Sequence, residues 1–198
     1  MMISKILVFL GKIEKSLFLL VVLLLTCAIV LPGCTREKGS APETKGESRG
    51  IGCAIYDRLP GDIAKKFEVN FENKIKLVGI TANRQSQDKF EVSYYWQLKD
   101  NLGKFTNVYV HFTDSGNNVL FQHDHVFCPK RSFEELKDKF VKETYIIDIP
   151  ETAKGKETYM KLGVYVPESS GPRLKIESAD GAVLDEKNTR ASVEKIKL

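Results

Sequence analysis

The side chains in this sequence that are best suited to chemistry gather in one short stretch. All three histidines, His111, His123 and His125, lie there, and Asp124 stands between the last two. Imidazole and carboxylate groups are common ligands of zinc and other transition metals. The turn residues at 115–118 predict a hairpin in which position 111 faces position 122. That register puts His111 on one face and the other two histidines on the opposite face. We therefore expect no metal or other cofactor, with His123 and His125 as the candidate ligands if a metal binds.

Other signatures of catalysis are scarce. The sequence has no His-Glu-x-x-His zinc motif and no glycine-rich phosphate-binding loop. Its 30 Lys and Arg residues against 26 Asp and Glu residues give a net charge of +4, too small for a nucleic-acid binder. We therefore expect a protein that is not an enzyme and has no nucleic-acid partner.

Several predicted strands carry tyrosines on their polar sides. Within Phe90–Lys99 the even positions are apolar and include Trp96, which we expect in the core. Tyrosine joins apolar area to a hydrogen-bonding hydroxyl, a combination suited to recognising glycans or proteins. If the strands concerned are neighbours, one face presents these candidate binding residues: Tyr95, Tyr109, His111, Gln122, Asp124, Tyr159, Lys161 and Tyr165. Tyrosines also suit pleated surfaces that bind nothing, and that alternative stays open.

The elements that must position these residues are strands. From about Phe67 the dominant hydrophobic period is two, in short segments separated by turn residues. One helix interrupts them, because Ser132 and Glu135 form a capping-box pattern ahead of Leu136. We predict an all-β protein, an antiparallel jelly-roll-like β-sandwich of about eight strands with one short helix, over residues 67–198.

The beginning of the chain is a different kind of segment. Of residues 1–33, 23 are apolar, and lysines precede an apolar run at 17–31. At about 1.5 Å per residue this run is short for a membrane-spanning helix and typical of an export signal. It ends at Leu31-Pro32-Gly33-Cys34, which resembles the lipobox of bacterial lipoproteins and implies lipidation of Cys34. An uncleaved signal anchor is the alternative. Both interpretations place the protein in the bacterial cell envelope, anchored to a membrane and facing the periplasm or the exterior.

Polar sequence separates this export signal or membrane anchor from the predicted sandwich. Residues 34–50 carry many charges and few apolar residues, so we expect a flexible tether. A connecting segment, 51–66, follows it. In an oxidising compartment Cys53 and Cys128 form an even pair and are candidates for a disulfide, with two free thiols as the alternative.

Residues 67–198 also resemble a known domain family. Short motifs in order are similar to the β-sandwich domains appended to membrane glycosyltransferases of the dolichyl-phosphate-mannose type. The motifs are Phe71-Glu72-Asn73-Lys74-Ile75, Leu77-Val78-Gly79, Tyr94-Tyr95-Trp96, Val110-His111-Phe112-Thr113-Asp114-x-Gly116, Gln122-x-Asp124-His125, Asp148-Ile149-Pro150, Leu162-Gly163-Val164-Tyr165 and Gly171-x-Arg173-Leu174. The resemblance implies a jelly-roll-like sandwich similar to carbohydrate-binding modules. Cys128-Pro129-Lys130 and the predicted helix replace the family's usual Pro-rich loop and Trp-Gly stretch.

These features lead to three functional hypotheses. The first is a lipid-anchored, non-enzymatic module that binds an envelope glycan or an envelope protein through the tyrosine-bearing face. The alternative is a structural accessory subunit of a membrane enzyme such as a glycosyltransferase. The second alternative is a metal-binding site on the histidine hairpin.

Overall fold

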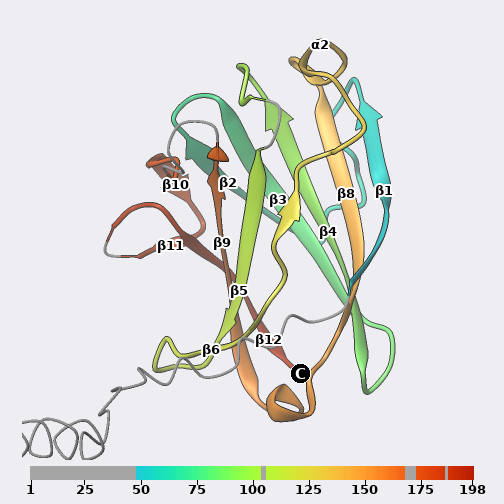
Figure 1. The fold of residues 1–198 in the computed structure, drawn as a ribbon, viewed down its shortest axis with the longest axis vertical. Helices are drawn as coiled ribbons and strands as arrows, with labels where there is room; N and C mark the ends of the chain where they lie inside the picture. Colours follow the sequence, from blue (N-terminus) through green and yellow to red (C-terminus); the bar gives the residue numbers. More distant parts are fainter. Residues whose placement is uncertain (1–47, 104–105, 168–172, 186) are drawn as a thin grey trace, which may run out of the picture. The chain divides into compact units, whose positions relative to one another are not determined.

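Strands dominate the part of the chain that the structure describes. This computed structural model describes residues 48–103, 106–167, 173–185 and 187–198, which form two antiparallel sheets packed face to face (Figure 1). The first sheet has the strand order β1-β8-β4-β3-β2-β10. Its strands are β1 (Ser48–Tyr56), β2 (Lys65–Phe71), β3 (Ile75–Arg84), β4 (Lys89–Leu98), β8 (Phe140–Asp148) and β10 (Ile176–Asp180).

The second sheet has the order β11-β12-β9-β5-β6, and β7 also pairs with β5. Its strands are β5 (Asn107–Thr113), β6 (Val119–Gln122), β7 (His125–Val126), β9 (Glu157–Tyr165), β11 (Val183–Leu184) and β12 (Ala191–Lys197). The predicted all-β antiparallel sandwich is confirmed. The described residues contain more strands than the eight expected, partly because β7 and β11 have two residues each, too few for an alternating pattern to reveal.

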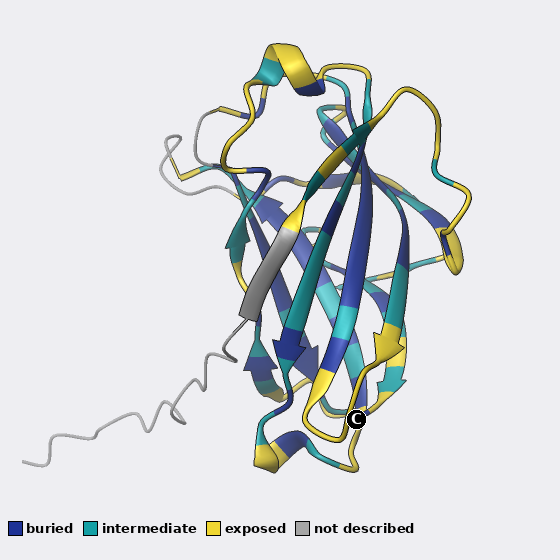
Figure 2. Ribbon diagram, turned by 90° about the vertical axis from the view of Figure 1, so that its right-hand side faces the viewer, coloured by how far each residue is buried: buried dark blue, intermediate teal, exposed yellow. Residues whose placement is uncertain are grey.

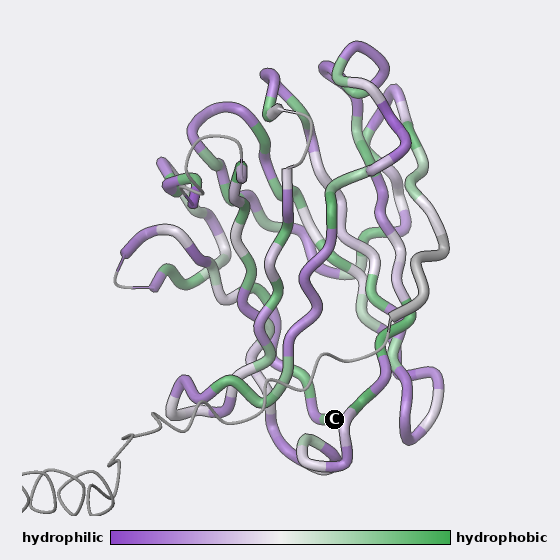
Figure 3. Tube along the Cα trace, viewed as in Figure 1, coloured by the Kyte–Doolittle hydropathy of each residue, from purple (hydrophilic) through white to green (hydrophobic). Residues whose placement is uncertain are grey.

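Alternating side chains along the strands build the core. The even positions of β4 point between the sheets, and Trp96 among them is fully buried, as predicted. Contacts across the two layers include the Phe90 and Phe112 rings, whose centroids are 5.3 Å apart, and the Tyr94 hydroxyl, 3.9 Å from the sulfur of Met160. Figure 2 shows the buried positions as dark blue bands along the strands, and Figure 3 shows polar and apolar residues alternating along the chain.

The predicted helix is present as α2 (Phe133–Leu136). The Ser132 hydroxyl accepts a hydrogen bond from the Glu135 amide, and the Glu135 carboxylate accepts one from the Ser132 amide, so the capping box forms in full. A short 3-10 turn, η1 (Glu151–Ala153), was not predicted.

The domain begins earlier in the chain than the sequence indicated. Strand β1 pairs with β8 from Ser48 onward and forms an edge of the first sheet. Residues predicted as the end of the tether and as a connecting segment therefore belong to the sandwich. A disulfide joins Cys53 of β1 to Cys128, which follows β7, with 5.7 Å between the two Cα atoms. It links an edge strand of one sheet to the chain that leaves the other.

Residues 1–47, which include the predicted signal, Cys34 and most of the predicted tether, lie outside the described residues. Within the described ranges, no helix has the length and apolar character needed to cross a membrane.

Candidate functional site

Three neighbouring strands of the second sheet carry most of the predicted binding residues. Pairing places His111 of β5 opposite Gln122 of β6 and opposite Lys161 of β9. Because side chains alternate along a strand, six predicted residues share the side of this sheet that faces away from the core. They are Tyr109, His111, Gln122, Tyr159, Lys161 and Tyr165. We call this side the outer face of the second sheet.

Tyr109 lies on the outer face but is only 3 % exposed. Its ring lies across Gly163, where an added Cβ would collide with the Tyr109 hydroxyl oxygen, so the position needs glycine. The hydroxyl donates a hydrogen bond of 2.5 Å to the Thr189 carbonyl, and the Arg173 guanidinium lies 4.7 Å from the ring centroid. Burial raises the pKa of this tyrosine. Tyr109 therefore holds the β11–β12 connection against the sheet. The sequence predicted that Tyr109 would contact a ligand directly, but its ring is covered by this connection.

The β11–β12 connection is organised by Asp185. One carboxylate oxygen accepts hydrogen bonds from the amides of Lys187 and Thr189, and the other lies 3.2 Å from Nε of Arg190. Arg190 also reaches the outer face, because its Nη1 is 3.0 Å from Nδ1 of His111. The Arg190 guanidinium is thus held between a carboxylate on its own hairpin and a histidine on β5.

A cavity of about 570 Å³ opens between this hairpin and the outer face. Four cationic side chains line it against one carboxylate among the described residues, together with Asn117 from the β5–β6 turn. The charged lining residues are Lys161, Arg173, Lys187, Arg190 and Asp185. Partial burial, with the Arg190 charge nearby, lowers the pKa of Lys161, whose amine donates a hydrogen bond to the Asn117 side chain. The cavity is therefore a concentrated positive region in a protein of small net charge.

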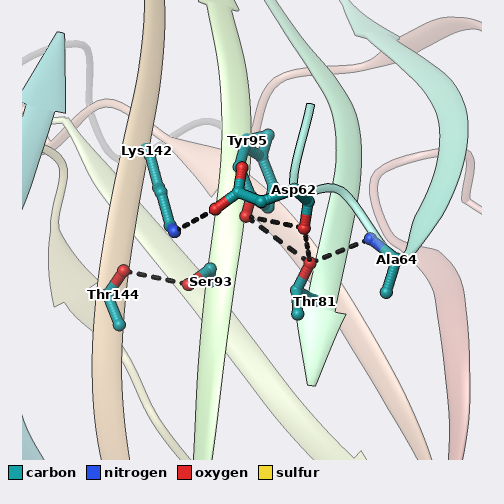
Figure 4. A network of polar contacts seen from close by, with 7 residues as sticks. All are labelled: Asp62, Ala64, Thr81, Ser93, Tyr95, Lys142 and Thr144. Carbon is teal, nitrogen blue, oxygen red and sulfur yellow. Dashed lines mark hydrogen bonds and ion pairs between the residues drawn. The ribbon is translucent and has the colours of Figure 1, made fainter. Parts of the chain in front are cut away.

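Tyr95 does not belong to this site, which corrects the sequence prediction. It lies on β4, in the first sheet, and is 1 % exposed. The segment between β1 and β2 crosses over it, and the Tyr95 hydroxyl lies 3.4 Å from the Asp62 carbonyl and 3.5 Å from the Thr81 hydroxyl (Figure 4). The Lys142 amine lies 5.4 Å from the Tyr95 ring centroid and pairs with the Asp62 carboxylate at 2.6 Å. These contacts hold a crossing segment against the outside of the first sheet.

Asp124 is exposed and lies between the core-facing His123 and His125, so it keeps the predicted side of the strand. Its carboxylate accepts a hydrogen bond of 3.1 Å from the Val110 amide, so it caps the backbone of β5 at the break between β6 and β7. Its predicted neighbours are placed as expected, because position 111 does face position 122.

His123 and His125 lie on the core side of their strand, as the predicted register requires. The two rings are stacked with centroids 4.8 Å apart, and each contacts the Tyr145 ring. Nε2 of His125 is 3.5 Å from the buried carboxylate of Glu143, and Glu143 also accepts a hydrogen bond from the Cys128 amide. Burial, with His125 nearby, lowers the pKa of His123 to about 3. We call His123, His125, Glu143 and Tyr145 the buried histidine cluster.

Two sequence patterns with possible chemistry were compared with the described part of the chain. Within the described part of the chain, no group of three or more His, Cys, Asp or Glu side chains is arranged to hold a metal ion. The sequence Gly46-Glu47-Ser48-Arg49-Gly50 matches the Gly-x-Ser-x-Gly pattern of hydrolases. That pattern needs a sharp turn from a strand into a helix, whereas Ser48 begins strand β1 and pairs with Ile147.

Three residues of the cavity lining were not predicted from the sequence: Arg173, Lys187 and Arg190. Arg173 lies at an isolated bridge, Lys187 lies in a turn and Arg190 lies just before β12, so no alternation marks the direction of their side chains. One usable signal was present, because Asp185 shortly before Asn188 and Thr189 is typical of a turn that a carboxylate organises. Comparisons with protein-family models, with curated proteins and with solved structures found no match.

Proposed function

We propose that this protein is a non-enzymatic binding module of the bacterial cell envelope, held at a membrane by its N-terminal segment. Its binding surface is the outer face of the second sheet together with the cavity beside it. The observation that carries the proposal is the clustering of Lys161, Arg173, Lys187 and Arg190 around one cavity next to half-buried polar and aromatic side chains.

The chemistry of this surface suits recognition. Arginine side chains present several donors in a fixed plane, and tyrosines add apolar area with a polar tip. Arg190 is held between Asp185 and His111, so its orientation is set before any ligand arrives. A site positioned in advance loses less entropy on binding.

The outside of the first sheet offers less free surface for a partner. On the outside of the first sheet, the segment around Asp62 and Ile63 already covers Tyr95 and Gly79, and among the described aromatic residues of that sheet Tyr56, at its edge, stays exposed. This contrast favours the second sheet as the side that meets a partner.

A capture experiment tests the proposal. Full-length protein in detergent is exposed to a glycan array and, separately, to extracted envelope proteins, beside a variant carrying Lys161→Ala and Tyr165→Ala. We expect retention of a glycan or of one envelope protein, and at least a tenfold weaker retention by the variant. Equal retention by both proteins would show that the partner uses another surface. If the accessory-subunit alternative holds, a membrane enzyme should co-purify with the full-length protein in the same detergent preparation.

A further inference from the structure

We infer that the cavity beside the outer face of the second sheet recognises an oxyanion, a carboxylate or a phosphate, carried by a saccharide. This rests on the proposed function and specifies its ligand class. The cavity is the region between the β11–β12 hairpin, the β5–β6 turn and strand β9.

The charges that line the cavity are unbalanced among the described residues. Asp185 is the one carboxylate among the described lining residues, and its two oxygens are already engaged by backbone amides and by Arg190. In the described part of the chain, Lys161, Arg173 and Lys187 form no ion pair. Cations gathered in a recess repel one another, and an anion bound between them relieves that repulsion.

The hydrogen-bond donors that line the cavity suit an oxyanion. Two of the four cations are arginines, whose planar guanidinium groups match the paired oxygens of a carboxylate or a phosphate. Both are already oriented: Arg190 by Asp185 and His111, and Arg173 by the Tyr109 ring beneath it. Asn117 extends the set with a side-chain amide that also holds the Lys161 amine.

The size of the cavity and the aromatic ring near it favour a saccharide over a free ion. A cavity of about 570 Å³ is much larger than one oxyanion. Tyr165 is half-buried beside it, with its ring centroid 6.3 Å from that of Tyr109, and it pairs through the backbone with Arg173. An aromatic ring next to the cations gives the apolar face of a pyranose ring a surface to lie on while its acidic substituent enters the cavity.

The decisive experiment compares ligands that differ only in charge. Binding of the full-length protein in detergent is measured to an oligogalacturonate and to the same oligosaccharide after its carboxylates have been reduced to alcohols. A phosphorylated sugar with its unphosphorylated form, and inorganic phosphate alone, complete the set. We expect the acidic sugars to bind at least tenfold more tightly than their neutral forms, and inorganic phosphate to compete only weakly.

Substitutions of the lining residues test whether the acidic sugar binds in the cavity. Arg173→Gln and Lys187→Gln each remove one exposed cation of the lining and should weaken binding of the acidic sugar about tenfold. The matched control is Lys195→Gln, which removes the same charge from the same sheet. Lys195 lies 5.6 Å from the Tyr159 ring centroid and pairs with Glu157, away from the cavity, so its loss should leave the affinity unchanged.

The possible failures are distinct. Equal binding of acidic and neutral sugars would overturn the oxyanion inference while leaving glycan binding intact. Equal weakening by Lys195→Gln would show general charge attraction and would also overturn it. If inorganic phosphate binds as tightly as the acidic sugars, the saccharide contributes nothing to binding, and that part of the inference would be overturned. Capture of an envelope protein with no sugar binding would overturn the inference and keep the proposed function.

Discussion

Two tyrosines show what single residues contribute to this molecule. Tyr95 and Tyr109 both fall on the polar side of their strands in the sequence, and both are buried in the structure. Each is covered by a different connecting segment, the first by the chain around Asp62 and the second by the β11–β12 connection. Alternation predicted the side of each strand correctly. It carries no information on which loop crosses that side, because such a contact joins residues far apart in the sequence.

The buried histidine cluster makes the stability of the domain depend on pH. His123 is 3 % exposed, and in the described structure neither of its ring nitrogens has a hydrogen-bond partner. Its pKa is lowered from 6.5 to about 3, so the unfolded chain binds a proton at a pH where the folded chain does not. The stability contributed by neutral His123 is therefore present above pH 6.5 and is lost as the pH falls toward 3.

We predict that the free energy of unfolding drops by about 2 kcal/mol between pH 7 and pH 5 because of this residue. Denaturant titrations at the two pH values measure the drop. The variant His123→Phe keeps a ring against His125 and Tyr145 and should lose most of the pH dependence in that interval. If the unfolding free energy of the variant drops as much between pH 7 and pH 5 as that of the parent protein, another residue causes the pH dependence.

At the scale of elements, the disulfide links strand β1 covalently to the chain that leaves the second sheet. Among the described strands β1 pairs only with β8, at the edge of the first sheet, while Cys128 follows β7 of the second sheet. The bond therefore ties the beginning of the described chain to the opposite layer. It also lies next to the buried histidine cluster, since the Cys128 amide donates to Glu143.

Loss of this bond should cost stability without changing the fold. The two cysteines are 75 residues apart, and a loop of that length gives a chain-entropy contribution of about 4 kcal/mol. We predict that Cys53→Ser/Cys128→Ser lowers the midpoint of thermal unfolding while the far-ultraviolet circular dichroism keeps its β-type spectrum. Unchanged unfolding under non-reducing conditions would contradict a stabilising role for the bond.

Elements with their own local signals were predictable from the sequence. The β4 alternation, the β5–β6 hairpin register and the Ser132 capping box all appear in the structure as expected. The β11–β12 hairpin was not predicted, although it forms one wall of the candidate site. Strand β11 of this hairpin has only two residues. The shape of the hairpin depends on the ion pair between Asp185 and Arg190 and on the hydrogen bond from Tyr109 of β5 to Thr189. The second contact joins residues far apart in the sequence.

At the scale of the whole molecule, the net charge conceals a local concentration. The chain carries +4 overall, yet four cations with one described carboxylate surround a single cavity. A count over the sequence could not find this feature, because Lys161 lies in β9 and Arg190 lies just before β12, and folding brings both to the same cavity. The site is therefore a property of the folded sandwich, whereas the predicted anchor is a property of the sequence alone.

The proposed membrane anchor can be tested at this scale. Intact mass of the membrane-extracted protein should correspond to a chain that starts at Cys34 with a diacylglyceryl-sized addition, as the Leu31-Pro32-Gly33-Cys34 sequence implies. Cys34→Ser should abolish that addition. An unmodified chain that retains residues 1–33 would show an uncleaved signal anchor and would overturn lipidation.

Lysine labelling of the protein in its own envelope tests the central claim most directly, because the measurement works whatever the ligand is. An amine-reactive reagent is applied to intact envelopes and to the purified protein, and labelling at each lysine is compared by mass spectrometry. If the outer face of the second sheet meets a partner, Lys161 and Lys187 should be labelled several-fold less in the envelope, while Lys89 and Lys99, at the two ends of β4 in the first sheet, stay equally reactive. Unchanged labelling of Lys161 and Lys187, with protection of the first-sheet lysines, would contradict the proposed binding surface.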